Sequence, residues 1–377
     1  MLLNSMHIYG SLYVIYILFS LFISKIKYKN TIIVFWLLWS FLASFYAYLI
    51  VPEFTFDLFR YYGWIYESGI AYSSIWEAAE GNPLFVREVI YYLCSRMDSP
   101  HYFSAIPTFF QYFLPLLIIY LECIRANTST KKILFLGWVF ISVSDYFTIT
   151  CVVRCPFSVA VFFFILYCEI RKIISSKFAF IVYLSIPFFH TIGFALLFFK
   201  LLFFRLKIKK ATFLFLTAAF GLVINTYFYE IVTLFNSDLL IALAWQSDSY
   251  FMNEENVSEM AGDGPKFIFY GAILFLFFIT SVIVEKSDSL KKYFDEKLYA
   301  FLSFLQICAI FALLAGGINQ DVSNRFTYPL ILGQILFFVP LINNTCVNKR
   351  LLPVLLLYSI FGLIYQTRYY PFVHFYL

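Results

Sequence analysis

The chain has 377 residues, of which 62% are hydrophobic and only 13% are charged, with a formal net charge of +5 at pH 7. Long apolar runs recur from end to end, which excludes an ordinary soluble globular protein and predicts an all-α polytopic membrane protein. The excess of basic residues lies in the links between these runs, so it indicates contact with anionic membrane lipids and no binding to nucleic acid.

Apolar runs suited to membrane helices follow one another along the chain when it is read with a window of about 20 residues. The first run has no basic residue before it and three lysines after it, which favours an uncleaved first helix over a signal peptide. We find no internal repeat and no soluble segment, so we expect one transmembrane domain over residues 1–377. The runs cover residues 6–24, 31–51, 102–124, 133–150, 157–170, 178–204, 211–229, 266–284, 298–315, 326–342 and 351–366.

The links between the apolar runs alternate in charge. One set of links carries 20 of the 27 Lys and Arg residues, whereas the other set carries 16 of the 22 Asp and Glu residues. Because basic links are retained in the cytoplasm, the first set is expected there, and the second set is expected outside together with both termini. Two links of the outer set are long enough to be called extracytoplasmic loops, at about 52–100 and 230–265.

The run at 178–204 has basic residues at both ends, so a single crossing of the membrane is disfavoured. We expect a hairpin of two short helices that turns near Pro187–Thr191. Each arm would be about 20 Å long at 1.5 Å per residue, which is less than the hydrocarbon core of about 30 Å. The apex would then lie within the membrane beside a wet cavity. Counting the hairpin as two helices gives about 12 transmembrane helices.

The first outer loop contains helix and turn signals. Ser74 and Glu77 have the spacing of a capping box, so a short helix is expected to begin there. Asn82-Pro83 predicts a turn, and residues 84–97 have the pattern of an amphipathic helix lying on the surface. The second outer loop is acidic and is interpreted as a lid.

A few arginines remain in the outer set that charge bias does not explain, chiefly Arg60, Arg154 and Arg325. Arg154 precedes Cys155-Pro156 where a helix should begin, Arg325 precedes a late helix, and His190 falls at the apex of the hairpin. Helix N-termini favour anions, and Arg adds two parallel donors that match phosphate oxygens. The pattern predicts a diphosphate clamp. Each Arg could instead be an interfacial anchor or half of a salt bridge, and His190 a packing residue.

The seven cysteines form no metal-ligand pattern. Cys151 and Cys155 flank Arg154, but no second pair accompanies them. We therefore interpret the cysteines as small membrane-buried residues and predict neither a metal nor a cofactor.

Five short stretches occur in an order that resembles the EpsG-like and Wzy-type polysaccharide (O-antigen) polymerases. They are Asp57-Leu-Phe-Arg-Tyr-Tyr, Asn82-Pro-Leu-Phe, Val153-Arg-Cys-Pro-Phe-Ser-Val-Ala, Phe189-His-Thr and Asn324-Arg-Phe-Thr-Tyr. The family usually has Glu before the loop Pro and Gln after the Arg, where this chain has Asn82 and Cys155. No catalytic role is therefore assigned to position 82.

The resemblance implies a metal-independent membrane glycosyltransferase with a GT-C-like architecture in the bacterial inner membrane. It would move a glycan from undecaprenyl diphosphate onto a lipid-linked repeat unit, as in lipopolysaccharide or capsule synthesis. Its partners would be these lipid-linked oligosaccharides, membrane lipids and, as a candidate, a chain-length regulator. The residues implied as catalytic are Asp57, His190, Arg154 and Arg325, and those implied as substrate-binding are Arg60, Tyr61, Tyr62 and Thr191. Asp57 and His190 are both candidates for the base.

Two alternatives remain open. A lipid-linked sugar flippase or another transporter could also use about twelve helices and an Arg-lined cavity, although the chain lacks the internal repeat of many transporters. The other is an O-antigen ligase or an acyltransferase, of which the ligase shares the polymerase's chemistry and differs only in its acceptor.

Overall fold

The structure is a computed structural model, and it describes residues 2–26, 28–52, 54, 56–80, 82–204, 264–287, 290, 293, 296–316, 320–367 and 374–376. The predicted span at 211–229 and nearly all of the predicted loop at 230–265 lie outside these residues.

The described chain is helical apart from three short strands. Five stretches within it are long and apolar enough to cross a membrane, namely Asn30–Tyr48, Tyr102–Arg125, Ile268–Lys286, Ser323–Asn343 and Val347–Thr367. The expected all-α membrane architecture is confirmed to this extent. The helices are α1 (Ser5–Ile23), α2 (Asn30–Tyr48), α3 (Asp57–Ala71), α4 (Ile75–Glu80), α5 (Phe85–Ser95), α6 (Tyr102–Arg125), α7 (Thr130–Val143), α8 (Tyr146–Cys151), α9 (Arg154–Ile170), α10 (Ser176–Phe189), α11 (Ile192–Phe204), α15 (Gly264–Lys286), α17 (Glu296–Gly316), α18 (Gln320–Asn343) and α19 (Thr345–Thr367).

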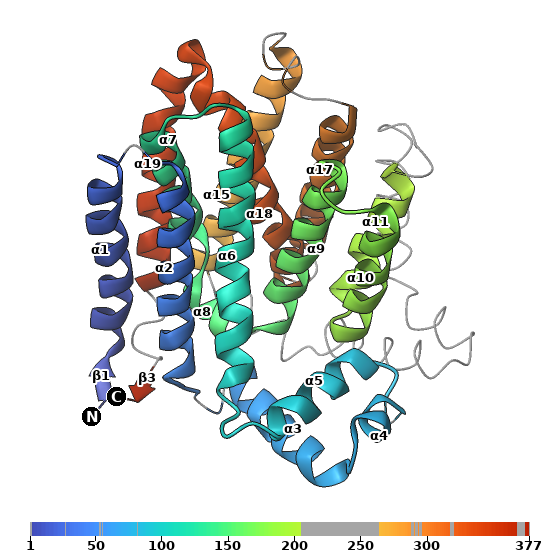
Figure 1. The fold of residues 1–377 in the computed structure, drawn as a ribbon. Helices are drawn as coiled ribbons and strands as arrows, with labels where there is room; N and C mark the ends of the chain where they lie inside the picture. Colours follow the sequence, from blue (N-terminus) through green and yellow to red (C-terminus); the bar gives the residue numbers. More distant parts are fainter. Residues whose placement is uncertain are drawn as a thin grey trace.

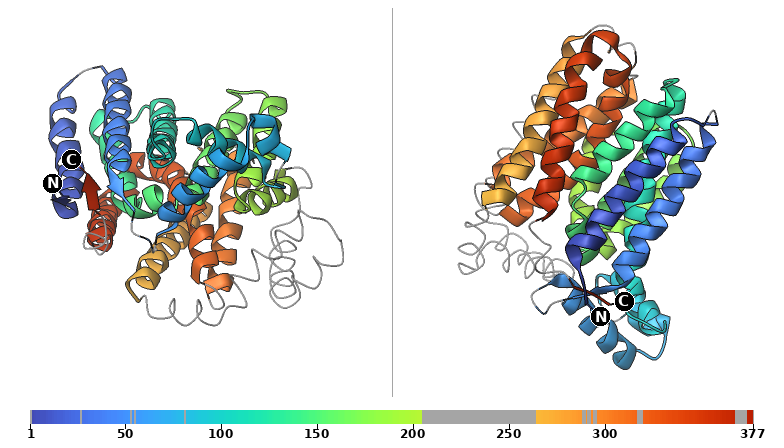
Figure 2. Two further views of the ribbon diagram at one scale, coloured as in Figure 1. Left: turned by 90° about the horizontal axis from the view of Figure 1, so that it is seen from below. Right: turned by 90° about the vertical axis from the view of Figure 1, so that its left-hand side faces the viewer.

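The long helices form a bundle with two unlike ends (Figure 1). Helices α3–α5 project beyond one end, and both chain termini lie at this same end, on the side of α1 (Figure 2). There the strands β1 (Leu2–Asn4), β3 (His374–Tyr376) and β2 (Ile50–Val51) form an antiparallel sheet in that order. We call this the loop end. The opposite end holds the links α1–α2, α6–α7, α9–α10 and α18–α19, and we call it the basic end. Its basic side chains include Lys25, Lys29, Arg125, Lys131, Lys132, Arg171, Lys172, Lys177, Lys349 and Arg350.

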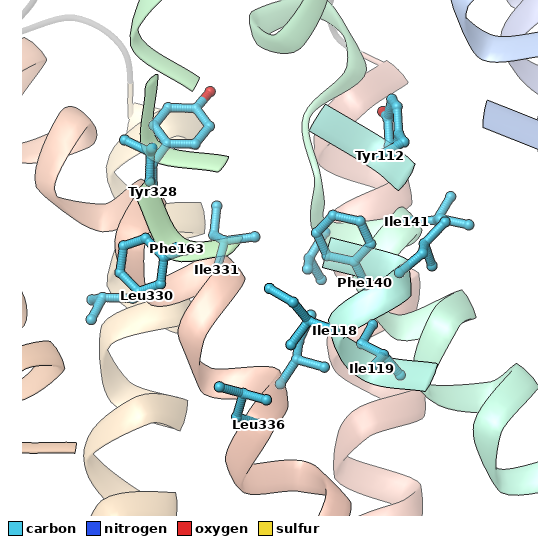
Figure 3. Packing of buried hydrophobic residues seen from close by; sticks show 14 of the residues in the cluster. Tyr112, Ile118, Ile119, Phe140, Ile141, Phe163, Tyr328, Leu330, Ile331 and Leu336 are labelled. Atoms are coloured by element: carbon cyan, nitrogen blue, oxygen red, sulfur yellow. The ribbon is translucent and has the colours of Figure 1, made fainter. Parts of the chain in front are cut away.

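Helix α18 is the centre of the bundle, because it contacts α6, α7, α9, α15, α17 and α19. Buried side chains of α6, α7, α9 and α18 fill the space between these helices (Figure 3). The packing is close: a Cβ added at Gly333 of α18 would come within 2.5 Å of Leu305 on α17. Helices in a bilayer gain no hydrophobic drive from meeting one another, so such close van der Waals packing must hold them together.

The apolar run at 133–150 was expected to form one helix, and this expectation is wrong. The chain breaks between α7 and α8 at Ser144 and Asp145, both of which are buried. Backbone groups freed at depth in a membrane protein must find partners inside the protein. Gln366 of α19 supplies them: its Nε2 donates to Ser142 O at 2.7 Å, and its Oε1 accepts from the Tyr146 N–H at 3.2 Å.

The predicted hairpin at 178–204 is confirmed, with the turn at His190–Thr191 between α10 and α11. The ammonium of Lys200 lies 4.0 Å from the centre of the Tyr183 ring, whereas one continuous helix would separate these residues by about 25 Å. A Cβ added at Gly193 would lie 2.6 Å from the backbone nitrogen of Pro187, so a glycine is needed where the two arms meet.

Two carboxylates, the half-buried Glu169 and the buried Glu122, tie α9 to the hairpin and to α6 at the basic end. Glu169 of α9 accepts from Tyr183 at 2.9 Å and pairs with Lys200 at 3.0 Å. Glu122 of α6 accepts from Tyr167 at 3.0 Å and from Nε of Arg171 at 3.0 Å. These contacts set the position of α9, whose other end begins the candidate site.

The first outer loop folds into α3, α4 and α5. Ser74 caps α4 by accepting from the Glu77 N–H at 3.2 Å, and Asn82 accepts from the Leu84 N–H at 2.8 Å, which confirms the predicted helix start and turn. Helix α5, predicted as an amphipathic helix on the surface, has protein against its buried face. It packs against α3, α4 and α10, and it buries Glu88 and Tyr91. An amphipathic pattern fits a protein groove as well as a membrane surface, and here the neighbours are protein.

Candidate functional site

Arg154 is the first residue of α9 and is only 8% exposed. The preceding residue, Val153, has φ 25°, a rare value for a β-branched residue, and it joins α8 to α9 through a strained link. This link directs Arg154 toward α3. Its guanidinium lies 4.6 Å from the centre of the Tyr61 ring and 5.4 Å from that of Trp64, both on α3. Contacts of this kind hold a cation in place over the ring faces, and Arg154 also shares a hydrogen bond with the Tyr61 side chain.

The donors of Arg154 are only partly used. Its Nε is buried and has no hydrogen-bond partner, and the hydroxyl of nearby Tyr91 on α5 is also buried and unpartnered. Arg154 forms no ion pair with any described residue. A guanidinium carries five donors and cannot lose its charge, so a buried one with unfilled donors is suited to receive an anion.

Asp57, the first residue of α3, is tied to its own helix. Its carboxylate pairs with Arg60 and accepts from the Tyr61 hydroxyl at 3.3 Å. Arg60 itself is 60% exposed and points outward. Burial raises the pKa of Tyr61, so this residue remains a hydroxyl donor at neutral pH. Asp57 acts electrostatically on both Tyr61 and Arg154, which places it at the border of the site.

His190 ends α10 at the apex of the hairpin and is 7% exposed. Its Nδ1 accepts from the backbone N–H of Ile192 at 3.3 Å, so the proton of the neutral ring is on Nε2. His190 thus caps the start of α11 with one nitrogen and keeps a donor on the other. The positive charges that act on it come from Arg325, Arg154 and Arg87. Thr191 follows in the link and is half-buried.

Arg87 was not expected in this group. Its Nε and Nη2 donate to the same oxygen of Glu88 at 2.9 and 2.6 Å, and the two side chains are 17% and 12% exposed. The packing of α5 against the hairpin lets the charge of Arg87 act on His190, and the tilted rings of Phe85 and Phe188 lie 4.7 Å apart, centre to centre, in the same contact. A cavity of about 310 Å³ opens beside Arg87 between α3 and α5, with Trp64, Tyr72 and Tyr91 in its wall.

Arg325 lies in the second turn of α18, because this helix begins at Gln320 and not after Arg325, at residue 326, as predicted. The polar residues before it are accommodated inside the helix. Ser323 donates to Ala312 O of α17 at 2.7 Å, and Thr327 donates to Ser323 O at 2.9 Å. Hydroxyl groups that bond to nearby carbonyls let a polar stretch remain helical. Arg325 therefore approaches His190 from the side of a helix and not from its first turn.

Tyr62 is not brought to the site. It follows Tyr61 on α3, and neighbouring residues of a helix point in different directions. The ring of Tyr62 packs instead against that of His101, with the ring centres 5.0 Å apart. Of the residues predicted from sequence, the structure thus joins Arg154, His190 and Arg325 and places Tyr61 and Asp57 beside them. Arg60 and Tyr62 stay outside.

We call Arg87, Arg154, His190 and Arg325 the loop-end cluster. They come from four separate parts of the chain, namely α5, α9, the hairpin apex and α18. Three permanent positive charges act on the His190 ring there, and among the described carboxylates Glu88 pairs with Arg87 while Asp57 acts on Arg154. Such a group can bind a doubly charged anion and stabilise negative charge that develops on it.

No known family model, curated protein or solved structure matches this chain. The functional argument therefore depends on the loop-end cluster, the membrane-type fold and the chemistry of their residues.

Proposed function

We propose that this protein is a polysaccharide polymerase of the bacterial inner membrane, which transfers a glycan from undecaprenyl diphosphate onto a lipid-linked repeat unit outside the cytoplasm. The observation that carries the proposal is the buried guanidinium of Arg154, with an unfilled donor, in a cluster with Arg87, His190 and Arg325. The motif order of the sequence supports the same function, because the cluster gathers residues from three of the five stretches that resemble polymerases.

In this proposal about twelve helices span the membrane in a GT-C-like architecture, the loop end faces outside and the basic end faces the cytoplasm. The distribution of basic side chains between the two ends supports that orientation. A lipid diphosphate anchored in the outer leaflet would then present its head group at the depth of the loop-end cluster.

The proposed reaction is a displacement at the anomeric carbon of the donor glycan. The acceptor hydroxyl forms the new glycosidic bond, and the bond from the anomeric carbon to the diphosphate oxygen breaks, with its electrons passing to that oxygen. Arg154, Arg325 and Arg87 stabilise the departing diphosphate, and each such contact can contribute about 2.7–4 kcal/mol to the transition state.

Proton transfer is assigned to Asp57, because the Nδ1 of His190 already accepts from Ile192. The remaining nitrogen of His190 carries a proton and can donate to the diphosphate. Asp57 lies at the border of the site and would accept the proton of the attacking hydroxyl.

The proposal is tested by the glycan ladder of a strain whose only copy of this protein is Arg154→Ala. Loss of one such contact predicts at least a hundredfold fall in polymer, at about 1.4 kcal/mol per tenfold. Arg154→Lys should restore little, because an ammonium lacks the planar fork. Arg96→Ala is the control: its guanidinium bonds Tyr72 O at 2.9 Å, outside the cluster, and the ladder should remain.

The same ladder separates the alternatives. A single repeat unit attached to the acceptor indicates a lost polymerase, whereas complete loss of attached glycan indicates a ligase. Accumulation of lipid-linked units on the cytoplasmic face indicates a flippase. A full-length ladder from Arg154→Ala would show that this arginine is only an interface anchor.

A further inference from the structure

A second cavity lies on the outside of the bundle, in a groove between α15 and α19. These helices run side by side (Figure 2). The groove has a volume of about 690 Å³ and is lined almost wholly by apolar side chains, including Phe275, Ile279, Val354 and Leu357. Among the described residues that line it, Arg350 is charged. None of the loop-end cluster contributes to it.

The shape of the groove suits a lipid chain. Along α19 it extends from Val347 to Phe361, which is about 21 Å at 1.5 Å per residue. One leaflet of a bilayer core is about 15 Å thick, so an acyl chain of that leaflet fits lengthwise. Phe275 and Leu357 remain 68% and 66% exposed in the walls. The hydroxyl of Tyr358 is turned away from an occupant, because it accepts from Gln334 at 2.8 Å.

The charge at one end of the groove indicates which lipid. Arg350 lies in the second turn of α19, at the basic end, and Lys349 is beside it. Lys286 ends α15 at the same end of the bundle, and all three side chains are exposed. The acidic side chain of Glu285, beside Lys286, accepts from Gln306 of α17 at 3.0 Å. A basic rim over an apolar groove complements an anionic head group above an acyl chain.

We propose that this groove binds an anionic glycerophospholipid, with an acyl chain between α15 and α19 and the phosphate at Arg350. The guanidinium supplies two parallel donors to the phosphate oxygens, and Lys349 and Lys286 add positive charge beside it. Because Arg350 and the loop-end cluster lie at opposite ends of the bundle, this lipid is not the substrate of the proposed reaction. The site would stand even if the proposed function failed.

The test is native mass spectrometry of the purified full-length protein, titrated with phosphatidylglycerol or phosphatidylcholine. Wild-type protein should bind the first molecule of phosphatidylglycerol several-fold more tightly than the first molecule of phosphatidylcholine. Arg350→Ala should weaken that binding about fivefold, as expected for one basic residue at a membrane surface, and Arg350→Lys should weaken it less. The matched control is Lys177→Ala, an exposed basic residue at the same end but outside the groove. It should change nothing.

A second arm tests the groove itself. Ala272→Trp places a large ring in the groove wall and should weaken both lipids by a similar factor. The proposal is overturned if wild-type protein does not prefer phosphatidylglycerol, if Arg350→Ala equals Lys177→Ala, or if Ala272→Trp binds normally. Displacement of phosphatidylglycerol by equimolar undecaprenyl phosphate would also overturn it, because the occupant would then be the carrier lipid.

Discussion

His190 is fixed at one ring nitrogen and available at the other. Nδ1 accepts from the Ile192 N–H and so caps α11, while Nε2 keeps the proton of the neutral ring, on which the three guanidinium groups of the cluster act electrostatically. The residue thus has a structural task and a chemical task that different substitutions can separate.

We expect His190→Asn to separate these two tasks. The short carbonyl of Asn can accept from the Ile192 N–H as Nδ1 does, so the amount of protein and its thermal unfolding in detergent should stay near wild type. The distal donor is lost, and one hydrogen bond to a charged group is worth about 1.5–3 kcal/mol, so polymer should fall at least tenfold. His190→Ala should lose both tasks and unfold at lower temperature. If His190→Asn still makes full-length polymer, His190 serves only to cap α11 and does not donate to the diphosphate.

Arg87 carries the next prediction. Arg87→Ala should reduce polymer at least tenfold, because one of the three charges facing the diphosphate is lost. That variant also leaves Glu88 buried without its partner. The double variant Arg87→Ala/Glu88→Gln removes this unpaired carboxylate, and it should fold normally yet remain defective. If the double variant restores the glycan ladder, Arg87 serves only to neutralise Glu88.

The place of Arg87 could not be predicted from its own segment. The pattern of α5 is amphipathic, and the same pattern fits a helix on a membrane surface or in a protein groove. The position of α5 is set by the hairpin about a hundred residues later in the chain, against which α5 packs. The adjacent pair Arg87-Glu88 was the available signal, because neighbouring opposite charges can enter a protein interior together.

At the scale of elements, the break between α7 and α8 depends on one side chain of α19. Gln366 satisfies backbone groups on both sides of the break and also accepts from Tyr13. Gly362, one turn earlier, permits this approach: a Cβ there would lie 2.4 Å from Ser142 O.

Gln366→Leu should therefore destabilise the bundle. Each buried polar group left without a partner costs about 1–3 kcal/mol, so the free energy of unfolding should fall by about 2 kcal/mol or more. Thermal unfolding in detergent measures the change. Thr367→Ala is the control on the neighbouring exposed residue and should be nearly neutral. If the two variants unfold at the same temperature, water must supply the hydrogen bonds of the backbone groups at the break.

Apolar runs predicted the long helices well. The run at 102–124 corresponds to α6 and that at 298–315 to α17, because uninterrupted apolar sequence is needed to cross a bilayer. The same criterion missed the break at Ser144–Asp145, since the partners that permit it are more than 200 residues away. It also placed the start of α18 too late, because polar residues whose hydroxyls bond to helix carbonyls look like a loop in the sequence.

At the scale of the whole molecule, the bundle places two separate groups of basic side chains at its opposite ends. Strands β1 and β3 bring both termini to the loop end, where the guanidinium groups of the cluster converge. At the basic end, basic side chains follow the helix links, and deeper carboxylates such as Glu122 and Glu169 are paired. The basic residues at the helix links therefore fix the orientation of the bundle, whereas the guanidinium groups at the loop end are suited to bind an anionic ligand.

The last prediction concerns which end faces the cytoplasm. Ser73 before α4 and Ser129 before α7 are both exposed and lie at opposite ends, so Ser73→Cys and Ser129→Cys are matched reporters. The described native cysteines are buried and should contribute little background. We expect a membrane-impermeant maleimide to label Ser73→Cys in intact cells and to label Ser129→Cys only after lysis, because basic links stay inside. A permeant maleimide should label both. The reverse pattern would put the loop-end cluster in the cytoplasm, where it could not meet a glycan assembled outside, and the polymerase proposal would fail with it.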